Sequence, residues 1–203
     1  MICPFSIMKK RDLEIKLESV SRFNDPDPSL EQYPTPSVIA SDMLFMAYAN
    51  GDISERKVND LGCGTGIFSI GAWLLNGDVA GFDISESAVK TAISNAEKFD
   101  ADIEFGICDV SDVKRRADTT IMNPPFGSQN RHADRPFLEK AMELSGTVYS
   151  LHMQRTFPFL QEYVSECGKE ICFHKTYKYQ IPHTFSFHTK NEHSIDLVLI
   201  VIR

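Results

Sequence analysis

The residues with the most distinctive chemistry form the tetrapeptide Asn-Pro-Pro-Phe at positions 123–126. Pro124 and Pro125 fix the backbone and remove two N–H donors, so the carbonyl groups of this turn are free to accept hydrogen bonds. The side-chain oxygen of Asn123 and the carbonyl of Pro124 could each accept one hydrogen of a planar amino group, while Phe126 stacks on the attached ring. This set predicts group transfer to an exocyclic amine such as adenine N6, where orientation matters more than a strong base.

A glycine-rich sequence, Asp-Leu-Gly-Cys-Gly-Thr-Gly, occupies residues 60–66, between a strand-like and a helix-like run. Gly62, Gly64 and Gly66 allow the backbone to turn tightly and approach a ligand, and the following helix offers free N–H groups. The spacing is not that of the dinucleotide fingerprint, and no Lys-Ser/Thr pair of a phosphate-binding loop follows. Asp60 could face a cationic ligand. The loop therefore predicts a nucleotide site, and a turn that serves only the fold is the alternative.

Two acidic residues, Asp83 and Asp109, close the next two strand-like runs. Asp83 follows the glycine-rich loop at close to the roughly 20-residue offset at which an acidic side chain meets ribose hydroxyls. Asp109 could accept a hydrogen bond from an adenine amino group. Open α/β sheets bind ligands at the carboxyl ends of their strands, so both positions favour binding residues. For Asp83, a cap on the next helix is the alternative.

The elements that must position these residues alternate between strand-like and helix-like patterns. Such alternation predicts an α/β fold, a parallel sheet with helices on both faces. The last two strand-like runs have no helix between them, so the final strand should run antiparallel to its neighbours. The expected strands cover residues 57–62, 78–84, 103–110, 119–125, 147–152, 171–181 and 194–202, and the expected helices residues 8–22, 37–50, 67–75, 85–99, 135–144 and 156–167.

Length and composition favour one large domain. The chain has 203 residues, of which 42% are hydrophobic and 24% charged, as in an average globular protein. We expect an N-terminal appendage, helix and linker over residues 1–29 and a single domain over residues 30–203. The net charge of −7 argues against a uniformly basic nucleic-acid-binding surface. Without a membrane-length apolar run or a secretory signal, we expect a cytoplasmic protein with its five cysteines reduced.

Other groups of reactive side chains are weaker candidates. Cys167, Cys172 and His174 supply only three of the four ligands of a structural zinc, so we expect no metal site. We do not expect Ser150 and His152 to form a nucleophile, on the reasoning that neighbouring side chains in a strand face opposite ways. The aromatic and basic residues between positions 169 and 190 could stack on RNA bases or belong to the core.

The order of these motifs resembles that of the class I S-adenosylmethionine-dependent methyltransferases that methylate amino groups. Segments at residues 30–35, 121–127, 149–152 and 187–200 are similar to the small-subunit ribosomal RNA N6-adenosine methyltransferases of the methyltransferase-like family and their archaeal relatives. The resemblance implies a Rossmann-like, seven-stranded sheet of order 3-2-1-4-5-7-6 with strand 7 antiparallel. It also implies further cofactor contacts, from the N-terminal side and next to the two acidic residues, by Gln32, Tyr33, Thr35, Ile84 and Val110.

The function that the resemblance implies is methyl transfer from S-adenosylmethionine to N6 of an adenosine in structured RNA, with ribosomal RNA expected. The base must leave its stack to enter a pocket, so the target should lie in a loop or bulge or be flipped out. Methylation of a protein glutamine at N5 shares the motif, but those enzymes usually have tyrosine after the two prolines. DNA adenine methylation stays open as well, whereas the intact Asn-Pro-Pro-Phe turn disfavours a non-enzymatic RNA-binding or assembly protein.

The strand at residues 103–107 should form one edge of the implied sheet. Ile103, Phe105 and Ile107 alternate with Glu104 and Gly106, and no lysine or proline prevents pairing with another chain. Methyltransferases of the resembled type often work with a small zinc-binding activator protein on that edge. We therefore expect such a partner here, and an edge covered by the chain's own loops or by a second copy is the alternative.

Overall fold

The computed structural model describes residues 8–23, 25–127, 133–180 and 194–203. Helices and strands alternate along the described chain, as the sequence patterns predicted. In chain order the helices and strands are α1 (Lys10–Glu18), α2 (Ser37–Ala49), β1 (Lys57–Leu61), α3 (Ile67–Leu74), β2 (Asp78–Asp83), α4 (Glu86–Glu97), β3 (Glu104–Ile107), β4 (Ala117–Met122), α5 (Arg135–Leu144), β5 (Ser145–Met153), α6 (Phe157–Glu166), β6 (Ile171–Gln180) and β7 (Ser194–Ile202).

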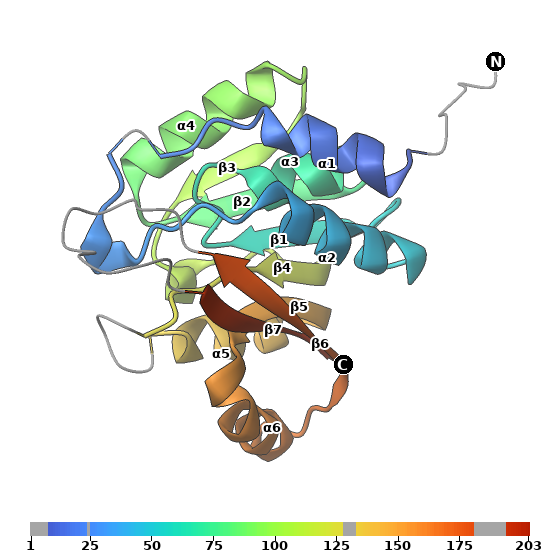
Figure 1. Ribbon diagram of the computed structural model, residues 1–203, viewed down its shortest axis with the longest axis vertical. Helices are drawn as coiled ribbons and strands as arrows, with labels where there is room; N and C mark the ends of the chain where they lie inside the picture. The colour runs from blue at the N-terminus through green and yellow to red at the C-terminus, as the bar shows by residue number, and fades with distance from the viewer. Residues whose placement is uncertain (1–7, 24, 128–132, 181–193) are drawn as a thin grey trace.

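The seven strands form one sheet of order β3-β2-β1-β4-β5-β7-β6 (Figure 1). Strands β1 to β5 pair in parallel, whereas β7 is antiparallel to both β5 and β6. The Rossmann-like fold, the strand order and the antiparallel final strand are thus confirmed. The strand order reverses between the neighbouring strands β1 and β4, and such a switch point is where open α/β sheets bind their ligands.

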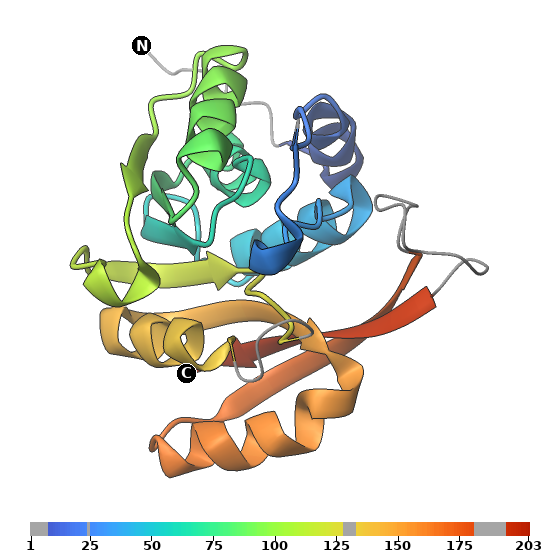
Figure 2. The same cartoon turned by 90° about the vertical axis from the view of Figure 1, so that its left-hand side faces the viewer.

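Helices cover both faces of the sheet (Figure 2). On one face, α1, α2 and α3 pack against a core that includes Leu13, Met43 and Ile70. On the other face, α5 and α6 bury side chains such as Leu138 and Leu160. Helix α1 thus shares a core with the sheet, and the division into an appendage over residues 1–29 and a domain over residues 30–203 stays a prediction.

Several elements are shorter than their sequence patterns suggest. Strand β4 ends at Met122, before the Asn-Pro-Pro-Phe turn, because the prolines cannot donate hydrogen bonds to a neighbouring strand. Strand β3 ends at Ile107, and a short 3-10 helix, Val110–Asp112, follows. Helix α4 begins after Ser85, which is its N-cap and whose hydroxyl accepts a hydrogen bond from the Ala88 N–H.

The reasoning about Ser150 and His152 on strand β5 is wrong, and the expectation that they form no nucleophile stays a prediction. Ser150 and His152 are two residues apart, so their side chains point to the same face of the strand. Their side chains are joined by a hydrogen bond of 2.8 Å between Ser150 Oγ and His152 Nε2.

The aromatic and basic stretch of the last third lies partly outside the described residues, at positions 181–193. Among the helices of the described ranges, none is long and apolar enough to cross a bilayer.

Candidate functional site

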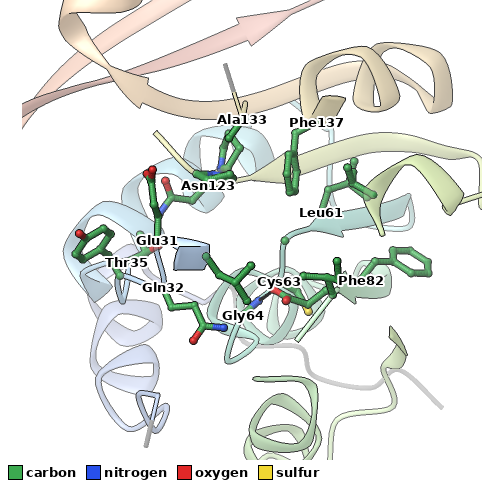
Figure 3. A pocket seen from close by; sticks show the side chains of 18 of the residues that line it. Glu31, Gln32, Thr35, Leu61, Cys63, Gly64, Phe82, Asn123, Ala133 and Phe137 are labelled. Atoms are coloured by element: carbon green, nitrogen blue, oxygen red, sulfur yellow. Dashed lines mark hydrogen bonds between the residues drawn. The ribbon is translucent and has the colours of Figure 1, made fainter. Parts of the chain in front are cut away.

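A cavity of about 410 Å³ opens at the carboxyl ends of β1, β2 and β4. It is lined by residues of the glycine-rich loop, of the Asn-Pro-Pro-Phe turn and of the segment before α2. In Figure 3, Glu31, Thr35 and Asn123 lie on one side of the cavity, and Leu61 and Phe137 lie on the other. The structure therefore brings the main motifs of the sequence together around one space.

The glycine-rich loop has a backbone that side chains would not tolerate. Gly62 and Gly64 adopt φ angles of 70° and 53°, in the left-handed region that favours glycine. A Cβ atom at Gly62 would lie 3.0 Å from the ring of Phe137, and one at Gly64 would lie 2.9 Å from the ring of Phe23. The two aromatic rings thus pack directly on the loop. Gly66 is the N-cap residue of α3 and does not line the cavity.

Asp83 connects the end of β2 to the glycine-rich loop. One carboxylate oxygen accepts a hydrogen bond of 2.8 Å from the Gly64 N–H, and the other accepts one of 2.8 Å from the Ser85 N–H. Burial raises the pKa of Asp83, and these hydrogen bonds partly offset the effect. Each oxygen retains a second lone pair for a ligand hydroxyl. Its neighbour Ile84 is 55% exposed and also lines the cavity.

Asp60, which we expected to face a cationic ligand, lies next to the last residue of β1. Its side chain is buried and does not line the cavity. One oxygen accepts hydrogen bonds from the Ser69 N–H (2.9 Å) and hydroxyl (2.6 Å) of helix α3. Burial raises the pKa of Asp60 to about 7. Asp60 therefore ties the end of β1 to α3, and through these elements supports the loop between them.

Asp109 and Val110 line the cavity beyond the end of β3. The Asp109 carboxylate accepts hydrogen bonds from the N–H (2.9 Å) and the hydroxyl (2.6 Å) of Ser111, which lower its pKa. Asp109 thereby caps the short 3-10 helix, Val110–Asp112. The charged carboxylate stands at the rim of the cavity, in a position to accept a further hydrogen bond.

The amide of Asn123 is held in one orientation. Its Nδ2 atom donates a hydrogen bond of 2.9 Å to Thr35 Oγ1. Its Oδ1 atom is buried and has no hydrogen-bond partner among the described residues. A buried oxygen of this kind is costly unless a donor reaches it. The side of the amide that can accept a hydrogen bond is therefore available to a ligand.

The segment before α2 closes over the Asn-Pro-Pro-Phe turn. The buried Glu31 accepts a hydrogen bond of 2.6 Å from the Phe126 N–H through its carboxylate. Gln32 lines the cavity, and its Oε1 atom accepts a hydrogen bond of 2.8 Å from the Asp27 N–H. Tyr33 lines the cavity too, and its partial burial raises the pKa of its hydroxyl. The turn is thus supported from a part of the chain far away in sequence.

Comparison with known proteins agrees with this arrangement. Residues 39–147 match the family described as Methyltransferase small domain. The chain belongs to this family. It is 38% identical to the rRNA N6-adenosine-methyltransferase METTL5 of Danio rerio, covering 97% of this chain and 98% of the relative. A protein of Methanocaldococcus jannaschii is 35% identical, covering 97% and 94%. A solved structure from Pyrococcus horikoshii has a TM-score of 0.89 at 40% identity, covering 97% and 98%.

The site of this methyltransferase small domain protein includes residues that sequence reasoning missed. Glu31 contacts the turn, and Phe23 and Phe137 pack on the glycine-rich loop. Glu31 immediately precedes Gln32, within the segment at residues 30–35 that carries the family resemblance, so its position was a usable signal. Phe23 and Phe137 carried no comparable signal, because an isolated phenylalanine is more often a core residue.

Proposed function

We propose that the chain is an enzyme that transfers a methyl group from S-adenosylmethionine to N6 of an adenosine in structured RNA, most specifically ribosomal RNA. The observation that carries the proposal is the buried Oδ1 atom of Asn123 beside the cavity, which has no hydrogen-bond partner within the described ranges. The named relative from Danio rerio, similar over nearly its whole length, supports the choice of ribosomal RNA.

The residues around the glycine-rich loop fit the cofactor. The loop brings its backbone close to the cavity, and Asp83 keeps lone pairs for two ribose hydroxyls. Asp109, Ile84 and Val110 line the cavity. Asp109 would accept a hydrogen bond from the adenine amino group, and Ile84 and Val110 would provide apolar contacts. When bound, S-adenosylmethionine supplies an electrophilic methyl group. We assign cofactor contacts to Gln32, Tyr33, Thr35, Gly62, Gly64, Asp83, Ile84, Asp109 and Val110, and supporting roles to Asp60 and Gly66.

The Asn-Pro-Pro-Phe turn would hold the target base. The Asn123 oxygen and the Pro124 carbonyl each accept one hydrogen of the exocyclic amine, and Pro125 keeps the turn rigid. Phe126, which lines the cavity, stacks on the base. An adenine N6 is a poor nucleophile because its lone pair is delocalised into the ring, and two fixed acceptors favour the tetrahedral form that attacks. The residues thus act by orientation and by stabilising charge that develops on the amine.

Methyl transfer from labelled S-adenosylmethionine to three substrates tests the proposal directly. We expect incorporation into ribosomal subunits or ribosomal RNA, and little into duplex DNA or a release-factor protein. The last substrate matters because a release factor glutamine methyltransferase of Bacillus subtilis is 33% identical over 39% of this chain. Label in the protein or the DNA but not in the RNA would reject the RNA assignment, and the Asn123→Ala variant serves as the inactive control.

We also propose a small zinc-binding activator protein as a partner at the β3 edge. Strand β3 pairs with β2 alone among the described strands, and Ile107 at its end is 54% exposed. Phe105 is a poor site for a test, because its ring would lie 2.8 Å from a Cβ at Gly81 and so packs within the chain. Ile107→Lys should abolish association. Ile15 on α1 has a similar exposure of 56%, and Ile15→Lys should leave the association unchanged. Full activity of the purified chain alone, with no small protein co-purifying, would exclude this partner.

A further inference from the structure

Three buried polar side chains, joined in a row by polar contacts, lie beside the cavity without lining it. Ser150 Oγ is 2.8 Å from His152 Nε2, and His152 Nδ1 is 3.3 Å from Asp134 Oδ2. We propose that these three groups form a positioning network that fixes the first turn of α5 against the cavity. The inference rests on the proposed function for its link to turnover, but its effect on the cavity can be measured separately.

The order serine, histidine, aspartate resembles a hydrolytic triad, but the burial of these residues excludes that use. Ser150 has 0% exposure and His152 has 1%, and neither lines the cavity. A nucleophile must reach the reacting atom of a substrate. A serine enclosed within the sheet cannot do so. The network therefore has a structural role, in holding parts of the protein in position.

His152 lies beside the Asn-Pro-Pro-Phe turn along the direction of the strands. In the β4–β5 ladder Ser150 pairs with Met122, the residue directly before Asn123. His152 is two residues farther along β5, beyond the point where the neighbouring strand has become the Asn-Pro-Pro-Phe turn. The imidazole is thus held at the carboxyl edge of the sheet, where the cavity opens.

Asp134 carries the network to α5. It occupies the N-cap position of this helix, where an aspartate usually accepts a hydrogen bond from the first turn. Here its side chain makes no cap hydrogen bond, and its carboxylate faces His152. The preceding residue, Ala133, and the first-turn residues Pro136 and Phe137 line the cavity. Anchoring Asp134 therefore fixes the part of the cavity lining that these residues form. Figure 3 labels two of them, Ala133 and Phe137.

The position of Phe137 connects this wall to the glycine-rich loop. A Cβ atom at Gly62 would lie only 3.0 Å from this ring, so the ring can pack on the loop because Gly62 has no side chain. A shift of the first turn of α5 would move the ring off the loop and change the shape of the cavity at the place where we assign the cofactor. Misplacement of a positioning group by about 1 Å can cost on the order of 100-fold in rate.

Asp134 determines the tautomer of the histidine, because a carboxylate can only accept a hydrogen bond. The ring proton therefore sits on Nδ1 and is donated to Asp134, and the Ser150 hydroxyl, which can donate or accept, donates to Nε2. Each ring nitrogen of the buried imidazole thus has a partner, as a buried polar network requires. Loss of either outer residue leaves one ring nitrogen without its partner.

The test compares Asp134→Ala with Ser145→Ala. Ser145 is also buried, lies on β5 at the far end from His152, and shares a hydrogen bond of 2.6 Å with Thr120. We expect both variants to melt at lower temperature than wild type. Only Asp134→Ala should bind S-adenosylhomocysteine more weakly by calorimetry and lose about 10- to 100-fold in kcat/KM on ribosomal RNA. Asp134→Asn, which keeps an oxygen acceptor for the imidazole, should recover most of the loss.

The proposal is overturned if Asp134→Ala has the same cofactor affinity and kcat/KM as the wild type. It is also overturned if Ser145→Ala loses as much cofactor affinity and kcat/KM as Asp134→Ala. The Nδ1–H tautomer should be visible in spectra of nitrogen-labelled histidine in the wild type, and the opposite tautomer would also contradict it. If wild-type protein binds S-adenosylhomocysteine but methylates no ribosomal RNA, the proposed function fails. The affinity comparison between the two variants still decides the network in that case.

Discussion

Replacing Thr35 by valine removes the acceptor that orients Asn123 while keeping the shape of the side chain. In the wild type, the 2.9 Å hydrogen bond from Asn123 Nδ2 to Thr35 Oγ1 fixes which end of the amide is free. The free end is the buried Oδ1 atom that we assign to the target amine. In Thr35→Val, nothing at position 35 distinguishes the two orientations of the amide, and the NH₂ group loses a partner.

The size of the effect follows from the hydrogen bond that is lost. A typical intramolecular hydrogen bond contributes about 0.5–1.5 kcal/mol net. Since about 1.4 kcal/mol corresponds to a factor of ten in rate, methyl transfer should slow by about 2- to 12-fold. This is far less than the roughly 10²–10³-fold loss expected when the amide itself is removed.

The assay is single-turnover methyl transfer to ribosomal RNA at saturating S-adenosylmethionine. Saturation separates the effect on Asn123 from the cofactor contact that we also assign to Thr35. Thr35→Ser retains the hydroxyl and is the matched control, expected to react at close to the wild-type rate. The reasoning is refuted if Thr35→Val matches the wild type, or if Thr35→Ser slows as much as Thr35→Val.

Four further predictions concern the same site. In Asn123→Ala the cofactor should still bind by calorimetry while turnover falls by roughly 10²–10³, and Phe126→Ala should weaken productive RNA binding by about 1–3 kcal/mol, measured as a rise in KM. Asp83→Ala should bind S-adenosylmethionine more weakly by about 10- to 100-fold, since hydrogen bonds to charged groups contribute about 1.5–3 kcal/mol; unchanged affinity would remove Asp83 from the cofactor site. Burial raises the pKa of Asp60 to about 7 in the folded chain, above its value of about 4 when unfolded, so folding favours the protonated form. This group should therefore lower the free energy of unfolding as pH rises from about 4 to 7, and denaturant melts of Asp60→Asn should lack this part of the pH dependence.

The parts of the fold and site that the sequence predicted are those set by local patterns. Alternating strand and helix signals predicted the seven-stranded α/β arrangement, and the loop between β1 and α3 was recognisable because Gly62 and Gly64 need positive φ angles. The strand ends were predicted less well. The apolar pattern extends the expected strand through Pro125 although proline cannot take part in the ladder, and the structure ends β4 at Met122.

The parts that could not be predicted depend on contacts between distant residues. Thr35 and Asn123 are separated by 88 positions, and Glu31 and Phe126 by 95. No local periodicity encodes such pairs. The orientation of Asp60 toward Ser69 was equally hidden, because strand position alone does not say whether a carboxylate at the loop faces the ligand or the next helix. The pairing of Ser150 with His152 could have been predicted, since it follows from the two-residue period of a strand.

Because Glu31 accepts the Phe126 N–H, one backbone amide reports whether the early segment is closed over the catalytic turn. This segment, residues 25–36, contains a single short 3-10 helix, Pro28–Leu30, and is held to the turn by side-chain hydrogen bonds rather than by a strand ladder. Segments with few ordered backbone hydrogen bonds open at lower free energy than a sheet. We therefore expect hydrogen exchange at Phe126 to be faster than in β4. Heating or mild denaturant should then abolish methyl transfer before the sheet unfolds. A melting curve of the whole protein therefore overestimates the temperature up to which the enzyme is active.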